Sequence, residues 1–150
     1  MRRIHLAAGD RILSTFENSD IGREPGTTYV DLRHSLPYAD RSIDVALISH
    51  ALALLQDREL VIREVYRVLK PGGWFRIDDN PKRFFFEAPD PDFDRCVHRF
   101  EVMRWLWMAG FQIVTTMDPS LTLIPEAPLV VRQILEAKTW HESMTIEARK

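Results

Sequence analysis

A glycine and two aspartates near the start of the chain have the spacing expected of a nucleoside-binding site at the edge of a parallel β-sheet. Gly9 follows a short apolar run at residues 4–8, and Asp20 ends a second strand-like run. Asp31 follows the β-prone residues 27–30, so both acids are expected at carboxyl ends of strands. At that edge of an open α/β sheet, a glycine turn lets a ligand approach the backbone and an acid grips ribose hydroxyls. The pattern predicts a nucleoside cofactor without distinguishing a dinucleotide from a sulfonium.

A serine and a histidine follow the strongest β-type run of the chain, residues 43–48. His50 has the chemistry of a general base, because histidine titrates near neutrality. The alternative is a polar residue that packs at the end of its strand beside Ser49. His5 lies inside an apolar run and is interpreted as a core histidine. We expect no metal site, because no ligand spacing relates the histidines at positions 5, 34, 50, 98 and 141.

The composition describes an ordinary cytoplasmic protein. A chain of 150 residues with 45% hydrophobic and 28% charged residues can bury the core of a single domain, expected to span residues 1–150. The net charge of −2 argues against a nucleic-acid-binding face. The basic pair Lys82 and Arg83 precedes three phenylalanines but is interpreted as part of a packed loop. The lone Cys96 fits a reducing cytoplasm, and no apolar run is long enough to span a membrane.

The elements that must position these residues alternate as in an α/β protein. Strands are expected at residues 4–8, 15–19, 27–30, 43–48, 74–77, 111–116 and 143–148. Helices are expected at residues 58–69, 93–108 and 125–138, and the first crossover has room for at most about two helical turns near residues 11–14. We expect the Pro-Gly-Gly at 71–73 to stop the first long helix. On the second, Arg104 and Trp107 are expected on the apolar face. Residues 80–92 are expected to pack as a lid or an edge.

Three motifs carry a family resemblance. Residues 36–44 read Leu-Pro-Tyr-Ala-Asp-Arg-Ser-Ile-Asp, residues 64–73 read Glu-Val-Tyr-Arg-Val-Leu-Lys-Pro-Gly-Gly, and residues 109–111 read Ala-Gly-Phe. In this order the chain resembles the class I S-adenosylmethionine-dependent methyltransferases, in particular their compact, type 11-like group. The resemblance implies a Rossmann-like three-layer α/β sandwich. It also implies a mostly parallel sheet in the order 3-2-1-4-5-7-6 with strand 7 antiparallel, and here no N-terminal lid extension.

The resemblance also implies roles for individual residues. S-adenosylmethionine is the implied cofactor, Asp20 would hold its ribose hydroxyls, and Ile21 would also belong to the cofactor site. Asp31 and Leu32 would flank the adenine. The loop after the first strand would approach the methionine part, and it comprises Leu6, Ala7, Ala8, Gly9 and Asp10. Ser49 and His50 would face the reacting methyl group, with His50 as the catalytic candidate.

Two departures from the family pattern leave two hypotheses. Ala7 replaces the family's first glycine, and Ala53 and Leu54 replace a frequent Glu-His pair. The first hypothesis is methyl transfer to an unidentified acceptor, expected to be a small molecule, with Ser49, His50 and residues 82–92 bordering its pocket. The second is a non-catalytic domain of the same fold that acts as a binding or assembly partner. A second copy of the chain could cover the open cofactor edge, although nothing in the sequence sets the oligomeric state.

Overall fold

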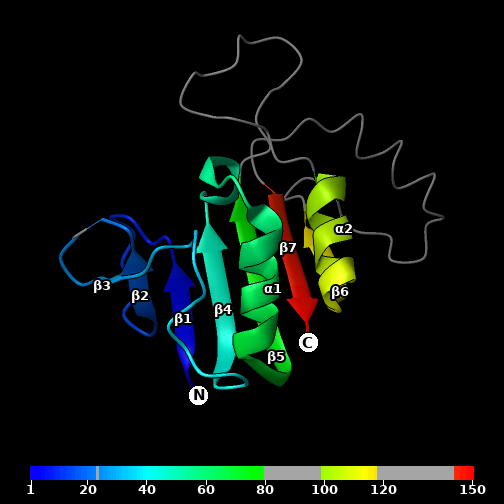
Figure 1. Cartoon of the computed structure of the whole chain (residues 1–150), viewed down its shortest axis with the longest axis horizontal. Helices are drawn as coiled ribbons and strands as arrows, with labels where there is room; N and C mark the ends of the chain where they lie inside the picture. Colours follow the sequence, from blue (N-terminus) through cyan, green and yellow to red (C-terminus); the bar gives the residue numbers. More distant parts are fainter. Residues whose placement is uncertain (23, 80–98, 118–143) are drawn as a thin grey trace, which may run out of the picture.

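A seven-stranded mixed sheet forms the centre of the computed structural model, which describes residues 1–22, 24–79, 99–117 and 144–150 (Figure 1). Its order is β3-β2-β1-β4-β5-β7-β6. The strands are β1 (Arg3–Leu6), β2 (Glu17–Asp20), β3 (Thr28–Tyr29), β4 (Ile43–Ser49), β5 (Leu69–Asp79), β6 (Gln112–Met117) and β7 (Met144–Arg149). The helices are η1 (Leu52–Leu54), α1 (Arg58–Val68) and α2 (Arg99–Ala109). β7 runs antiparallel to both of its neighbours, which confirms the predicted Rossmann-like topology.

Alternation of side chains along the strands gives the sheet one apolar face, which the helices α1 and α2 cover. Ile4 and Leu6 of β1 are fully buried and share a core cluster with Phe75 of β5. α1 covers this face with the predicted apolar stripe, in which Val61 and Val65 are buried. α2 packs beside α1. None of the described helices has the length and hydropathy needed to cross a membrane.

The buried face of α2 differs from the predicted one. Trp107 is 74% exposed and Arg104 is exposed, whereas Val102 and Leu106 are fully buried. The spacing of 102 and 106 places these two branched side chains on one helix face, which packs against the core. The tryptophan therefore lies on the solvent side, and the prediction for Trp107 and Arg104 is wrong.

The helix α1 ends before the Pro-Gly-Gly segment that was expected to stop it. Leu69 already has extended backbone angles and begins β5. The glycines serve the strand instead, because a Cβ at Gly73 would lie 2.9 Å from the carbonyl oxygen of Lys70 and 3.1 Å from that of Asp44. The first of these distances is shorter than real Cβ contacts and the second is unusually tight, so Gly73 permits this close approach of two backbones.

The two longest motifs of the resemblance are joined by one arginine. Arg67 donates from its guanidinium to the carbonyl oxygens of Leu36 and Tyr38, each at 3.0 Å. It also donates to Glu64, at 2.8 and 3.0 Å, and pairs with Asp40. Arg67 and its partners in the two motifs therefore form a polar clamp at the C-terminal end of α1. The residues that match the family here stabilise the fold.

The first crossover contains turns and no helix at residues 7–16. It packs on the face of the sheet opposite α1, where the ring of Phe16 meets the edge of the buried His5 ring. The expected helix at 125–138, the lid or edge at 80–92 and residues 93–98 lie outside the described residues.

Candidate functional site

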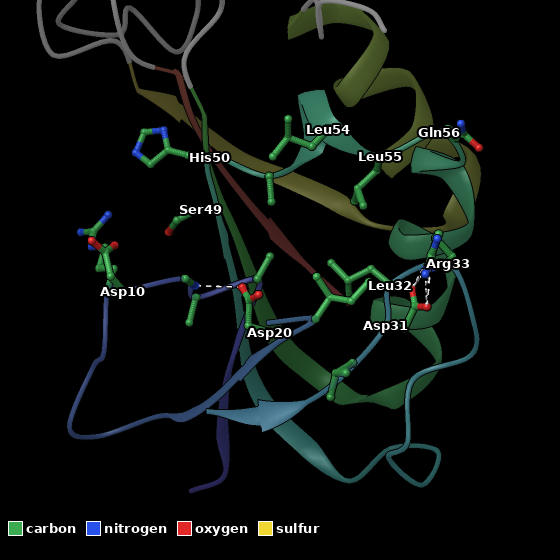
Figure 2. Close-up of a pocket in the computed structure, with 17 residues that line it drawn as sticks. Asp10, Asp20, Asp31, Leu32, Arg33, Ser49, His50, Leu54, Leu55 and Gln56 are labelled. Atoms are coloured by element: carbon green, nitrogen blue, oxygen red, sulfur yellow. Dashed lines mark hydrogen bonds and ion pairs between the residues drawn. The ribbon is translucent and has the colours of Figure 1, made fainter. Parts of the chain in front are cut away.

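A cavity of about 680 Å³ opens where the parallel strands β1 to β4 reach their carboxyl ends (Figure 2). It contains every predicted site residue but one. The lining residues are Ala7, Ala8, Gly9, Asp10, Arg11, Asp20, Ile21, Val30, Asp31, Leu32, Arg33, Ser49, His50, Ala51, Leu54, Leu55 and Gln56. Leu6 does not line the cavity, because its side chain points to the helix-covered face and is fully buried in the core.

The turn after β1 brings the backbone to the cavity. Ala7 and Gly9 both have left-handed φ angles, +51° and +53°. A non-glycine residue pays about 1 kcal/mol or more in this region, so Ala7 is a strained position of the kind that gathers at functional sites. The Ala7 side chain packs against the core. A Cβ at Gly9 would have no neighbour within 4 Å, which leaves open space above the turn.

Asp20 ends β2 with its carboxylate fixed by two backbone amides. Gly9 donates to Oδ2 at 2.9 Å, and Gly22 donates to Oδ1 at 2.7 Å. An ionised carboxylate has about four lone-pair sites, so roughly half remain for a ligand. Asp20 can therefore accept hydrogen bonds from vicinal hydroxyl groups without losing its own support.

Asp31 is held differently. Its carboxylate accepts from the backbone and side chain of Arg33, with the shortest contact 2.7 Å, and the Nδ1 of His34 lies 3.3 Å away. The hydrogen bonds from the Arg33 guanidinium hold the pKa of Asp31 well below its usual range. Asp31 is an ionised carboxylate whose acceptors are already used.

Ser49 and His50 occupy the other end of the cavity, beside Asp10 (Figure 2). The Ser49 hydroxyl is buried without a hydrogen-bond partner among the described residues. A buried hydroxyl without a partner costs free energy, which a polar ligand atom would recover. His50 has a left-handed φ of +53°, is exposed, and donates from its backbone N–H to the carbonyl oxygen of Asp78 at 2.7 Å.

The apolar wall of the cavity is built on η1, and the sequence reasoning missed it. Leu54 is 56% exposed and lines the cavity together with Leu55. Leu52 anchors this segment, because its N–H donates to the buried Asp79 and its carbonyl oxygen accepts from the buried Arg58. The signal available in the sequence was Leu54, which stands where the family frequently has a polar residue.

His5 lies outside the cavity, as predicted for a core histidine. It is fully buried, and its Nδ1 lies 3.3 Å from the Oδ1 of Asn18. Because this Oδ1 can only accept, a hydrogen bond between the two side chains requires the proton on Nδ1. Burial lowers the pKa of His5. Within the part of the chain that the structure describes, no three metal-ligating side chains come together.

Comparisons with known proteins found a family model and relatives that match parts of this chain. Residues 17–77 match the family model of the methyltransferase domain. A probable S-adenosylmethionine-dependent methyltransferase of Mycolicibacterium smegmatis is 33% identical over 97 residues, which are 59% of this chain and 37% of that protein. The ubiquinone/menaquinone biosynthesis C-methyltransferase UbiE of Rubrivivax gelatinosus is 35% identical over 78 residues, 47% of this chain and 31% of that protein. The chain thus spans about a third of the length of these curated relatives.

A solved structure shares the fold over the whole chain. The crystal structure of the [4+2]-cyclase SpnF covers 99% of this chain and 74% of its own, with a TM-score of 0.70 and 21% identity. This likeness concerns the fold alone. The match at residues 17–77 spans the first two of the three motifs and confirms the resemblance that they indicated.

Proposed function

We propose that this chain, whose family match and fold are those of the class I S-adenosylmethionine-dependent methyltransferases, transfers a methyl group from S-adenosylmethionine to a small-molecule acceptor. The family match implies this cofactor. The observation that carries the proposal is the Asp20 carboxylate, which two backbone amides fix at the cavity with acceptor capacity to spare. A ribose offers the matching pair of hydroxyl donors.

The cavity fits the remaining parts of this cofactor. The turn formed by Ala7, Ala8, Gly9 and Asp10 would hold the methionine part, where the open space above Gly9 lets the ligand approach the backbone. The base would lie at the opposite end, near Ile21, Asp31 and Leu32. The Ser49 hydroxyl would gain the hydrogen bond that it lacks. The cofactor supplies a sulfonium-bound methyl group that leaves by in-line displacement.

The protein's contribution to transfer is to hold donor and acceptor in line and to take up a proton where the acceptor must lose one. His50 is the residue for the second task, because it lines the cavity at the end away from Asp31. An imidazole nitrogen of His50 would accept the proton of a hydroxyl or amine acceptor. An acceptor carbon is a second candidate, which the similarity to the C-methyltransferase UbiE favours.

Calorimetric titration with S-adenosylmethionine and S-adenosylhomocysteine tests the proposal. Saturable heat and a thermal shift are expected for the wild type. Asp20→Asn should weaken binding about tenfold or more, because a hydrogen bond to a charged group contributes about 1.5 to 3 kcal/mol. Glu59→Gln, an exposed acid on α1, is the matched control and should change nothing.

The outcomes separate the two hypotheses. Absence of heat and of a thermal shift at millimolar ligand would end the enzyme hypothesis and favour a non-catalytic binding or assembly domain. Binding that Asp20→Asn leaves unchanged would refute the ribose assignment. Binding that is retained in His50→Gln with methyl transfer lost would support the proton-accepting role of His50.

A further inference from the structure

The carboxylate of Asp31 has no acceptor left for a ligand. Its Oδ1 accepts from the backbone N–H and the Nε–H of Arg33, each at 2.9 Å, and its Oδ2 accepts from a terminal nitrogen of the guanidinium at 2.7 Å. The Nε–H of Arg33 also donates to Oδ2, at 3.2 Å. These contacts use the roughly four lone-pair sites of an ionised carboxylate. Whatever binds at this end of the cavity must therefore meet a different group.

That group is the guanidinium of Arg33. Two side-chain hydrogen bonds to one carboxylate fix the plane of a guanidinium as well as its position. The side chain of Arg33 is 65% exposed, against 10% for Asp31, so the arginine is the accessible partner of the pair. Figure 2 shows the pair at the end of the cavity opposite Asp10 and His50, on the side of Leu55.

The surroundings of this pair suit an uncharged flat ring. Val30 and Leu32 are buried apolar residues that line the same end, and Leu55 is half-buried there. The charge of Arg33 is balanced by Asp31, so an anion gains little from the pair. The Arg33 side chain is 65% exposed and lines the cavity, so a ligand can reach the guanidinium, and the flat faces of this group stack on aromatic rings and nucleobases.

We propose that Arg33 is the stacking surface for the purine base of the cofactor, and that Asp31 acts as a positioning residue that holds the guanidinium plane. This inference rests on the proposed function, since the purine is the base of an S-adenosyl ligand. Arg33 then contacts the ring of the purine. Asp31 does not accept a hydrogen bond from the exocyclic amino group of adenine. The base is then recognised by its flat face.

Calorimetry on the full chain with three related ligands tests this assignment. S-adenosylhomocysteine carries adenine, S-inosylhomocysteine carries an oxo group in place of the amino group, and S-ribosylhomocysteine has no base. Arg33→Ala and Arg33→Lys should each weaken the first two ligands about fivefold, as expected for the loss of a stacking contact. Both should leave S-ribosylhomocysteine unchanged. Arg63→Ala, an exposed arginine of α1, is the control and should affect none of them.

Each outcome decides the matter. If Arg33→Lys binds S-adenosylhomocysteine with wild-type affinity, a positive charge is enough and the planar guanidinium is not needed. This result would overturn the inference. A wild-type preference of more than about tenfold for adenine over hypoxanthine would show that protein groups read the hydrogen-bonding edge of the base, at the amino group or at N1, which also overturns the inference. Wild-type binding with unchanged Arg33 variants removes this inference alone, whereas a wild type that binds none of the ligands removes the proposed function and this inference together.

Discussion

Replacing Arg67 with methionine should destabilise the fold by about 2 to 4 kcal/mol. The guanidinium donates to the carbonyl oxygens of Leu36 and Tyr38, and each bond from a charged donor contributes roughly 1 to 1.5 kcal/mol at a partly exposed site. The pair with Glu64 adds about 0.5 kcal/mol, and the pair with the exposed Asp40 adds less. Methionine keeps the apolar part of the side chain, so the loss of stability measures the contribution of the hydrogen bonds and ion pairs of the guanidinium.

Urea denaturation and calorimetry measure this loss. At roughly 2 to 4 °C per kcal/mol for a chain of this size, the melting temperature of Arg67→Met should fall by about 5 to 15 °C. Arg63→Met, on the exposed side of the same helix, is the control and should stay within about 0.5 kcal/mol of the wild type. The affinity for S-adenosylhomocysteine should be unchanged in both variants, because neither arginine lines the cavity.

The pH dependence gives a second check on the clamp. The hydrogen bond from Arg67 lowers the pKa of Glu64 below its ordinary value of 4.5. The associated stability is complete above pH 4.5 and is lost as the pH falls through the lower folded pKa. The difference between wild type and Arg67→Met should therefore shrink in acid. A loss below about 1 kcal/mol at pH 7, or one equal to that of Arg63→Met, would refute the clamp.

Two further predictions concern packing and protonation. Gly73→Ala should cost about 2 to 3 kcal/mol in urea denaturation, because its Cβ would meet the carbonyl oxygen of Lys70 at 2.9 Å, whereas Gly9→Ala should cost about 1 kcal/mol from its backbone angle alone. Equal losses would contradict the close approach at Gly73. Because burial lowers the pKa of His5 from 6.5, the wild type should lose stability as the pH falls below about 6.5, and His5→Gln should lose less between pH 7 and pH 5. Parallel pH profiles would show that His5 is not responsible.

Most strands could be predicted from short runs with clear boundaries, whereas their order was implied by the family resemblance. Alternation along residues 143–148 predicted the terminal strand β7, but alternation alone could not place it beside β6. The face of α2 could not be predicted, because tryptophan counts as apolar in any pattern while packing against α1 selects Val102 and Leu106. Only the neighbouring helix decides which apolar residues are buried.

Asp20 and Asp31 both line the cavity, but the hydrogen bonds of each carboxylate depend on loop conformation. Asp20 and Asp31 look alike in the sequence, as acids that follow strands. Two backbone amides donate to the carboxylate of Asp20, whereas the side chain of Arg33, two positions later, donates to that of Asp31. The apolar wall at Leu54 likewise depends on a short helix held through Leu52. Such contacts join loops that no periodicity relates.

The most direct test of the central claim uses the amides that support Asp20. Gly9 and Gly22 both donate to this carboxylate, so their amide resonances report any ligand that binds to it. Titration of the labelled chain with S-adenosylhomocysteine should shift the Gly9 and Gly22 amides with one saturable curve and leave the distant Gly73 unmoved. Saturable shifts confined to other parts of the chain, or no shifts at millimolar ligand, would contradict the assignment of this cavity to the cofactor.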